Sequence, residues 1–222
     1  MPARVLGTGR LGRSARAATI QESTRQVRSP AGYRRKAMGI TFQAPDVAGR
    51  IELMERAEAA FPERRVEITE SGDIHLTMSP SRRHAIIARR LEHWLAGFVE
   101  DPTRVQTTGH IMTRGDGMRE SEVMVFDDRD LPDDWATPAE YRRLVIEINS
   151  PGNPDNDWWV EMSAYAGSGI PHYWIVDPDE RVAMLTLGID VDGAPAYHQL
   201  SKQRPTVDEL TASAALPEGV RL

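Results

Sequence analysis

The segment 144–151 constrains the fold most, because it is an apolar run interrupted by a single carboxylate. Alternate side chains of a strand point to opposite faces. One face would carry Leu144, Ile146 and Ile148, and the other Val145, Glu147 and Asn149. Such an apolar run is typical of a strand deep in a sheet, where a carboxylate is costly unless it is paired, hydrogen-bonded or bound to metal. Glu147 therefore needs a partner, unless the strand lies at a sheet edge with its polar face in water.

Two other glutamates are candidate partners for Glu147. Glu122 opens an apolar strand 25 positions before Glu147. Two neighbouring strands could bring both carboxylates around a hard divalent ion, which prefers oxygen ligands. Glu67, in an earlier hairpin, could supply a third carboxylate. Each has a simpler interpretation, since acids are common at the start of strands and Glu67 fits a solvent-facing strand position.

Beyond residue 45 the apolar pattern predicts alternating helices and strands. Asp46 and Ser81 are suited to cap two helices, whose apolar side chains follow helical spacing as far as Phe61 and Phe98. We expect a loop at 132–138, a short helix at 158–165, and strands at 65–69, 73–78, 104–112, 122–126, 144–149, 172–176, 181–187 and 194–200. No strict strand–helix–strand repeat is present, so the predicted fold class is α/β in the mixed α+β sense, a mixed sheet flanked by helices.

Charge divides the chain into two regions. Residues 1–38 hold nine basic residues and one acid, whereas the rest of the chain holds 18 basic and 32 acidic residues. The first region has few large apolar residues, which predicts a disordered basic arm, or upstream sequence ahead of a start at Met38. A basic arm could contact nucleic acid, although a tail without a role is the simpler interpretation. We expect residues 39–222 to form a single domain.

Composition excludes several kinds of site. The 222 residues include no cysteine, so the chain has no disulfide, thiolate zinc site or cysteine nucleophile. The six histidines form no pair at metal-binding spacing, and Lys36 and Lys202 are the two lysines of the chain. No apolar stretch reaches the roughly 18 residues of a membrane span, so we expect a cytoplasmic protein without a membrane partner. The sequence leaves a homodimer open.

Four motifs carry a resemblance to a known family. They are Glu67-Ile68 ahead of Gly72, Met78-Ser79-Pro80-Ser81 followed by His84, Val145-Ile146-Glu147-Ile148 followed by Ser150-Pro151, and Tyr165 followed by Gly169-Ile170-Pro171-His172-Tyr173-Trp174 and Val176-Asp177-Pro178. With these motifs in this order, the region from Val66 to Leu200 resembles the large bacterial putative restriction endonuclease family with the PD-(D/E)XK nuclease fold.

The resemblance implies a metal-dependent DNA endonuclease that hydrolyses phosphodiester bonds with Mg²⁺ or Mn²⁺. Carried over to this sequence, Glu122 and Glu147 would be the metal-binding acids, and the main-chain carbonyl of Ile148 would be a further ligand. Glu67 would lie beside them and could bind the metal or hold its water. Asn149 stands at one of the positions where such nucleases carry a lysine, and it could hydrogen-bond a water.

Two departures from the family pattern fall at the chemical centre. Ser121-Glu122 stands in place of Pro-Asp, which keeps the charge but lengthens the side chain by one methylene. Glu161 stands four residues before Tyr165, where the family usually has its lysine, so an anion replaces a cation. The resemblance therefore leaves open whether the protein is an active enzyme.

Four glutamates that converge without a lysine need another source of positive charge. A metal ion, a proton, or an arginine such as Arg114 or Arg119 could supply it, unless Glu161 points away as a surface residue. DNA would also need a basic surface, which could be a strip of arginines on the helix after Ser81 or merely solvated side chains: Arg82, Arg83, Arg89 and Arg90. The alternative function is a catalytically impaired nuclease-fold protein that binds nucleic acid or protein.

Overall fold

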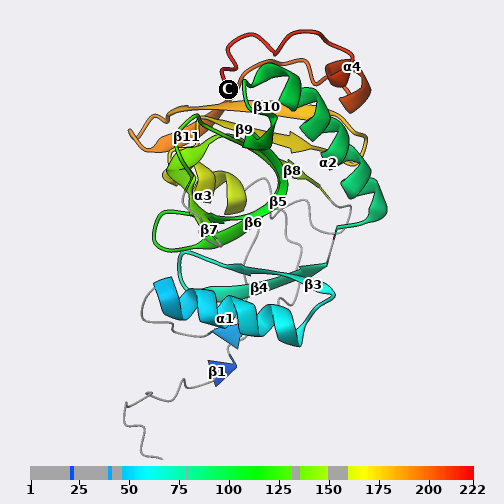
Figure 1. Ribbon diagram of the computed structural model, residues 1–222. Coiled ribbons are helices and arrows are strands. Elements are labelled where there is room, and N and C mark those ends of the chain that lie inside the picture. The colour runs from blue at the N-terminus through cyan, green and yellow to red at the C-terminus, as the bar shows by residue number, and fades with distance from the viewer. Residues whose placement is uncertain (1–20, 23–39, 42–46, 79, 132–135, 150–159) are drawn as a thin grey trace, which may run out of the picture.

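The computed structural model describes residues 21–22, 40–41, 47–78, 80–131, 136–149 and 160–222. In this part of the chain, eleven strands join one mixed sheet with helices packed against it, which confirms the predicted fold class (Figure 1). The strands are β1 (Gln21–Glu22), β2 (Ile40–Thr41), β3 (Arg64–Ile68), β4 (Asp73–Met78), β5 (Val105–Met112), β6 (Met118–Phe126), β7 (Ala136–Pro138), β8 (Arg142–Ile148), β9 (His172–Val176), β10 (Val182–Ile189) and β11 (Pro195–Gln199). The α-helices are α1 (Val47–Ala60), α2 (Arg82–Leu95), α3 (Met162–Gly167) and α4 (Val207–Thr211).

The strand β8 lies in the interior of the sheet. The strand order is β1-β2-β4-β3-β6-β8-β9-β10-β11, and β5 joins the sheet through β6 and β7. β8 pairs with β6 in antiparallel and with β9 in parallel orientation. Both edges of β8 are therefore occupied, so the interpretation of this apolar run as an edge strand is wrong.

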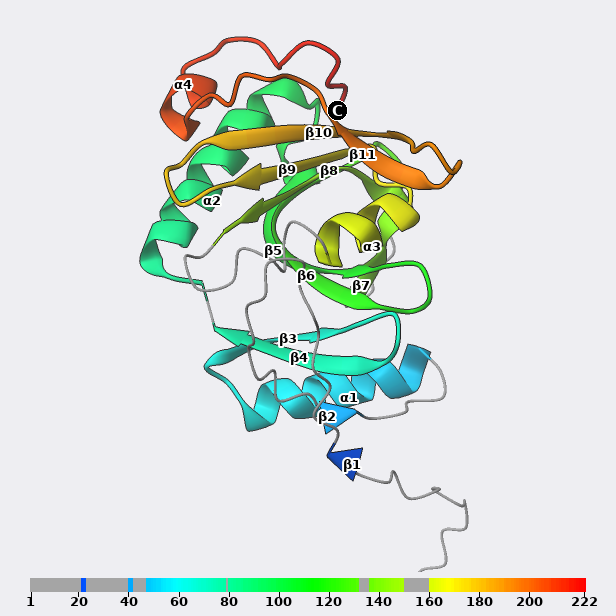
Figure 2. The same cartoon turned by 180° about the vertical axis from the view of Figure 1, so that it is seen from behind.

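One face of the central strands is covered by α2 (Figures 1 and 2). Ser81 caps this helix, because its hydroxyl accepts the main-chain N–H of His84 at 3.4 Å. Ile86, which belongs to the predicted apolar stripe, is 49% exposed on the outer side. Phe98 lies beyond the end of the helix and is partly buried against the same cluster. The rest of the stripe is buried against the apolar face predicted for β8, and it consists of Ile87, Leu91, Trp94 and Leu95.

The opposite face of the sheet is covered by α3, which lies within the curve of the strands (Figure 2). Tyr165 is fully buried there, in one cluster with Val145, and its ring centroid lies 5.3 Å from that of Tyr173. Gly169, with φ of +80°, follows the helix in the left-handed conformation that favours glycine. The helix begins at Met162, after a π-helical turn at 160–161, and residues 158–159 of the predicted helix lie outside the described residues.

The hairpin of β3 and β4 extends the sheet and is covered by α1 (Figure 1). Gly72, with φ of +86°, allows the tight turn between the strands. Met54 of α1 shares a buried cluster with Ile68 of β3 and Met118 of β6. Ile68 and Met118 are also the pair that joins β3 to β6 in register. Nearer the start of β3, its side chains contact acidic side chains of β6, and the candidate site lies there.

Three details of the expected elements differ from the structure. In the predicted loop at 132–138, Ala136–Pro138 forms β7 and pairs in parallel with β5, while residues 132–135 lie outside the described part. Phe61 follows the end of α1 and is 40% exposed, so it does not extend the apolar face of that helix. The sequence patterns did not indicate α4, which begins at a capping box formed by Thr206 and Glu209.

Two other expectations concern the division of the chain into an arm and a domain, and the absence of a membrane span. Of residues 1–38, the structure describes Gln21–Glu22, which pairs with β2, so the disordered arm and the single domain at 39–222 stay predictions. None of the helices in the described part combines the length and apolar character needed to cross a membrane.

Candidate active site

Three predicted site residues, Glu67, Glu122 and Glu147, lie on three strands that follow one another across the sheet, β3, β6 and β8. They are 1%, 7% and 1% exposed, respectively. All three carboxylates contact a single guanidinium, that of Arg65. Arg65 stands two positions before Glu67 and therefore on the same face of β3. The structure thus brings the three glutamates together around a cation that the sequence reasoning missed.

The guanidinium of Arg65 is surrounded by four carboxylates. Nη1 donates to Glu122 Oε1 at 2.7 Å, and Nη2 lies 3.5 Å from Glu147 Oε2. Nε lies 3.5 Å from Glu120 Oε2 and 3.8 Å from Glu67 Oε1. Burial opposes the charge of this side chain, but the four carboxylates outweigh burial and raise the pKa of Arg65 well above its ordinary value. Arg65 is therefore a permanent positive charge inside the cluster.

The surroundings of Glu147 oppose its negative charge. Burial raises its pKa well above the ordinary value, and the neighbouring carboxylates of Glu161 and Glu122 raise this pKa further. The hydroxyl of Tyr165 donates to Glu147 Oε1 at 2.8 Å and fixes the orientation of the carboxyl group. Glu161 itself is 2% exposed, so its interpretation as a surface residue is wrong.

Glu122 is the ionised partner of Glu147. Burial works to raise the pKa of Glu122, but Arg65 and a hydrogen bond with Glu147 outweigh burial and lower this pKa below its ordinary value. The main-chain N–H of Ile148 donates to Glu122 Oε2 at 2.8 Å and acts in the same direction. The pKa values of the two carboxyl groups are therefore shifted in opposite directions, because a negative charge on one disfavours a negative charge on the other.

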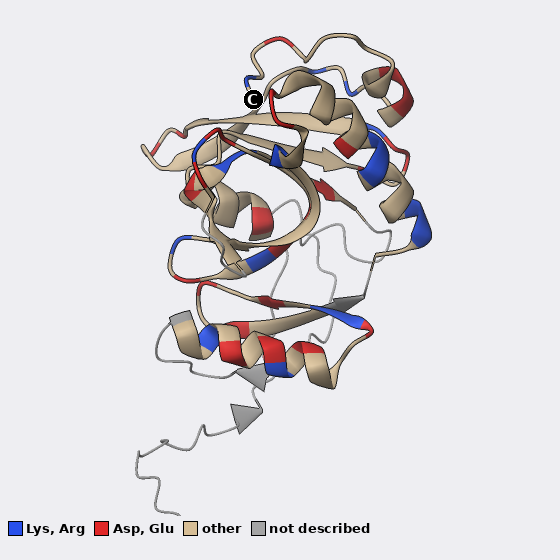
Figure 3. Cartoon of the chain, viewed as in Figure 1, with Lys and Arg blue, Asp and Glu red and all other residues tan. Residues whose placement is uncertain are grey.

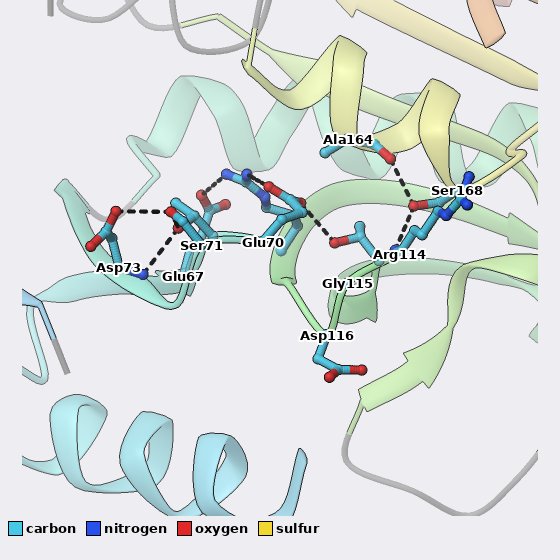
Figure 4. Close-up of polar contacts among 12 residues, drawn as sticks. Glu67, Glu70, Ser71, Asp73, Arg114, Gly115, Asp116, Ala164 and Ser168 are labelled. Carbon is cyan, nitrogen blue, oxygen red and sulfur yellow. Dashed lines mark hydrogen bonds and ion pairs between the residues drawn. The ribbon is translucent and has the colours of Figure 1, made fainter. Parts of the chain in front are cut away.

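Arg119 supplies a second buried cation, as one of the two arginines named from the sequence. Its Nη1 lies 3.6 Å from Glu67 Oε2, and its Nη2 donates to Glu70 Oε2 at 2.8 Å. Burial opposes this charge, but the two glutamates raise the pKa of Arg119 above its ordinary value. Arg114 is placed differently, because its main-chain N–H bonds Ser168 Oγ at 2.8 Å, well away from Glu67 (Figure 4). Glu67 is therefore held between two arginines, Arg65 and Arg119.

The end of β8 brings a histidine to the candidate site. Nε2 of His84 lies 2.8 Å from the main-chain oxygen of Ile148, and Nδ1 lies 2.8 Å from Ser81 Oγ. A carbonyl oxygen only accepts, so Nε2 is the protonated nitrogen and Ser81 donates to Nδ1. Asn149 is 3% exposed, and its main-chain N–H donates to Val176 at 2.8 Å. His84 is thus bonded to the carbonyl predicted as a metal ligand.

The arginines of α2 do not form a free basic strip. Figure 3 shows that basic residues gather on the outer side of this helix. Arg83 lies 3.0 Å from Glu180, and Arg89 lies 2.7 Å from Glu92. Arg90 pairs with an acid of α4, Asp208. Three of the four arginines considered from the sequence are therefore paired with acids, which leaves them less charge to offer to DNA.

The donor chemistry of the cluster fits a divalent cation. Carboxylates are the hard oxygen ligands that such ions prefer, and the buried glutamates exceed the arginines, Arg65 and Arg119, that neutralise them. In the described part of the chain, however, no three histidine or acidic side chains are arranged to hold a metal ion. Arg65 lies against Oε1 of Glu122 and Oε2 of Glu147, so a cation of the protein itself already contacts these oxygens. These side chains are of the type that binds a divalent cation. Arg65 would have to move away from the two oxygens before they could bind one.

Comparisons with known proteins place the chain in a family. Residues 51–222 match the model of the family Uma2, described as "Putative restriction endonuclease". The fold is also similar to the crystal structure of a protein from Anabaena variabilis ATCC 29413, described as a putative nuclease belonging to DUF820. That protein is 19% identical, the match covers 66% of this chain and 89% of the other, and the TM-score is 0.46. No curated protein matches the sequence.

Proposed function

Because the chain belongs to the Uma2 family of putative restriction endonucleases, we propose that it is a metal-dependent DNA endonuclease that hydrolyses phosphodiester bonds. The observation that supports this most is the meeting of Glu67, Glu122 and Glu147, from three strands, in one buried cluster. Burying several carboxylates is costly and is typical of functional sites rather than of structural ones. The family supports a nuclease-like activity, and the metal ion and DNA are the parts that experiment has to establish.

In the proposed site, Glu122 and Glu147 hold Mg²⁺ or Mn²⁺, and Glu67 binds the ion or its water. When bound, the ion supplies an activated water and stabilises negative charge on the phosphate. The residues of this chain orient the ligands: Tyr165 holds one oxygen of Glu147, and the N–H of Ile148 holds one oxygen of Glu122. The carbonyl of Ile148 can remain a ligand while bonded to His84, since a carbonyl oxygen has two lone pairs.

The proposal also gives roles to Asn149 and to DNA. Asn149 lies directly after β8, and its amide is proposed to hydrogen-bond the attacking water. DNA is proposed as the substrate from the family, although the paired arginines of α2 leave little free positive charge there. The basic residues at 1–38 would supply such charge, and a homodimer would bring two of these segments to one duplex. Light scattering of the full chain would detect the dimer.

A second function is favoured by a specific observation. Arg65 lies among the carboxylates of the cluster and pairs with them without any metal ion. A cluster held together in this way would stabilise the fold of a catalytically impaired relative, which would then bind nucleic acid or protein without cleaving it. The two functions differ in one property, the ability of Glu122 and Glu147 to bind a divalent cation.

A plasmid-nicking assay with Mn²⁺, Mg²⁺ or EDTA tests the proposed function. The variants E122Q and E147Q keep the size of each side chain and remove one proposed ligand. We expect nicking by the wild type to depend on the metal ion, and each variant to lower the rate at least about 100-fold. Glu63→Gln is the matched control, because the side chain of Glu63 is 67% exposed and lies outside the cluster. Nicking that continues in EDTA, or that survives E122Q unchanged, would remove the hypothesis.

A further inference from the structure

The two proposed metal ligands share an unusual pattern of hydrogen bonds. One oxygen of each carboxyl group is held by a protein donor: Oε2 of Glu122 by the N–H of Ile148, and Oε1 of Glu147 by the hydroxyl of Tyr165. The other oxygen of each group, Oε1 of Glu122 and Oε2 of Glu147, faces Arg65. The oxygen of each group that lacks a main-chain or hydroxyl donor is therefore the one that faces the guanidinium.

The shape of the guanidinium explains why one arginine contacts both groups. Nη1 and Nη2 of Arg65 form the two prongs of a planar fork, and one prong meets Glu122 while the other meets Glu147. A divalent cation held by Glu122 and Glu147 would lie close to the charge of Arg65. Like charges repel, so the contacts of Arg65 would oppose binding of the ion.

We propose that Arg65 is a positioning residue that competes with the divalent cation: it holds Glu122 and Glu147 in place, and it has to leave their facing oxygens before a metal ion binds them. The proposal rests on the metal site of the proposed function and adds the competition. Metal affinity in the wild type is then lower than the ligands alone would give, because each binding event has to break the contacts of Arg65.

Substitution of Arg65 tests the competition directly. The variant R65Q keeps a polar side chain but removes the charge and the fork. The matched control is Arg64→Gln, which removes the same charge from the neighbouring residue of β3, whose side chain is 39% exposed. We expect isothermal titration of the metal-free proteins to give R65Q at least about tenfold tighter Mn²⁺ binding than the wild type, since buried charge pairs contribute about that much or more. R64Q should bind as the wild type does.

The site of the gained affinity is checked with a double variant. R65Q/E147Q lacks one of the two ligands, so the gain of R65Q should disappear in it. Mn²⁺ binding by folded R65Q that is equal to or weaker than that of the wild type would overturn the competition, as would a gain that E147Q leaves intact. Tighter binding by R65Q without any nicking would support the competition and count against the proposed nuclease. Metal-dependent nicking by the wild type, without tighter Mn²⁺ binding by R65Q, would support the proposed nuclease and overturn the competition.

A measurement on the wild type covers the case in which R65Q does not fold. The Nε–H signal of Arg65 in a nitrogen-15 spectrum, assigned by its loss in R65K, should shift or exchange when Mg²⁺ is added. The Nε–H signal of Arg142 is the internal control, because its guanidinium donates to the main-chain carbonyls of Thr137, Pro138 and His110 rather than to the carboxylates of the cluster. An Arg65 signal that stays unchanged as Mg²⁺ is added would overturn the competition.

Discussion

Glu147→Gln is the substitution that most directly tests the charge state of the cluster. The amide of glutamine resembles a protonated carboxyl group, since its oxygen can accept from Tyr165 and its nitrogen can donate to Glu122. The fold raises the pKa of Glu147 well above 4.5, mainly through burial and then through Glu161 and Glu122. The folded protein therefore keeps a proton that the unfolded chain releases near pH 4.5. This contribution to stability is fully present below that pH and is lost as the pH rises toward the folded pKa.

The magnitude follows from the same linkage. While folded Glu147 keeps its proton and the unfolded chain has lost it, the free energy of unfolding falls by about 1.4 kcal/mol for each pH unit. The E147Q variant has no such loss. Its stability relative to the wild type should therefore rise by more than about 1.4 kcal/mol between about pH 5.5 and about pH 7.5. Histidines that titrate in this range are common to both proteins, so they cancel in the difference.

Urea unfolding, followed by tryptophan fluorescence in EDTA, measures this difference. Denaturation curves for wild type, E147Q and the exposed control E63Q are measured at the two pH values. For each protein they give the change in the free energy of unfolding between these pH values. The reasoning requires E147Q to gain on the wild type as the pH rises, while E63Q follows the wild type. An equal pH dependence in E147Q and the wild type would show that Glu147 is ionised in the folded protein, and the proton assigned to it would be refuted.

Three further predictions use neighbouring residues. Tyr165→Phe removes the donor to Glu147, so the free energy of unfolding should fall by about 1–2 kcal/mol in a urea titration; an unchanged value would contradict the hydrogen bond. Burial, followed by Arg65, lowers the pKa of His110 to about 4, so stability should be lost as the pH falls from about 6.5 toward about 4, and His110→Gln should flatten that loss in thermal unfolding curves. Glu161→Lys places a cation beside Glu147 and should raise the Mn²⁺-dependent nicking rate; a lower rate would argue against Glu161 standing at the lysine position.

The order of elements could be predicted because each one carries its own local signal. The alternation in β8, the cap at Ser81 and the glycine turn at Gly72 depend on residues close in the sequence. The same alternation predicted which side chains of β8 share a face and put Glu147 on the face opposite Leu144. In the structure, α3 covers the face of Glu147. Phe61 and Ile86 were misplaced because helical spacing shows that a residue is near the apolar stripe, and packing decides whether it is covered.

Arg65 could not be found by the same reasoning. Its neighbours Glu63 and Arg64 are charged and exposed, so the start of β3 resembles a solvent-facing hairpin. The burial of Arg65 depends on the approach of β6, whose Glu122 is 57 positions away in the sequence. One signal was available: Arg65 and Glu67 are two residues apart in a strand, so a role for Glu67 inside the protein would also turn Arg65 inward.

Arg65 offers a physical interpretation of the lysine that the resemblance predicts and this sequence lacks. By the resemblance, Glu161 stands where a lysine is expected, and Arg65 of β3 supplies a positive charge to the cluster instead. Lysine would give a point charge beside the carboxylates, whereas the fork of arginine contacts two of them at once. The replacement therefore does more than restore the charge, since it also covers the oxygens that an ion would use. In the proposed site the contacts that stabilise the cluster are the same contacts that would oppose metal binding, so the proposed competition between Arg65 and a divalent cation would decide whether the site can act as a nuclease.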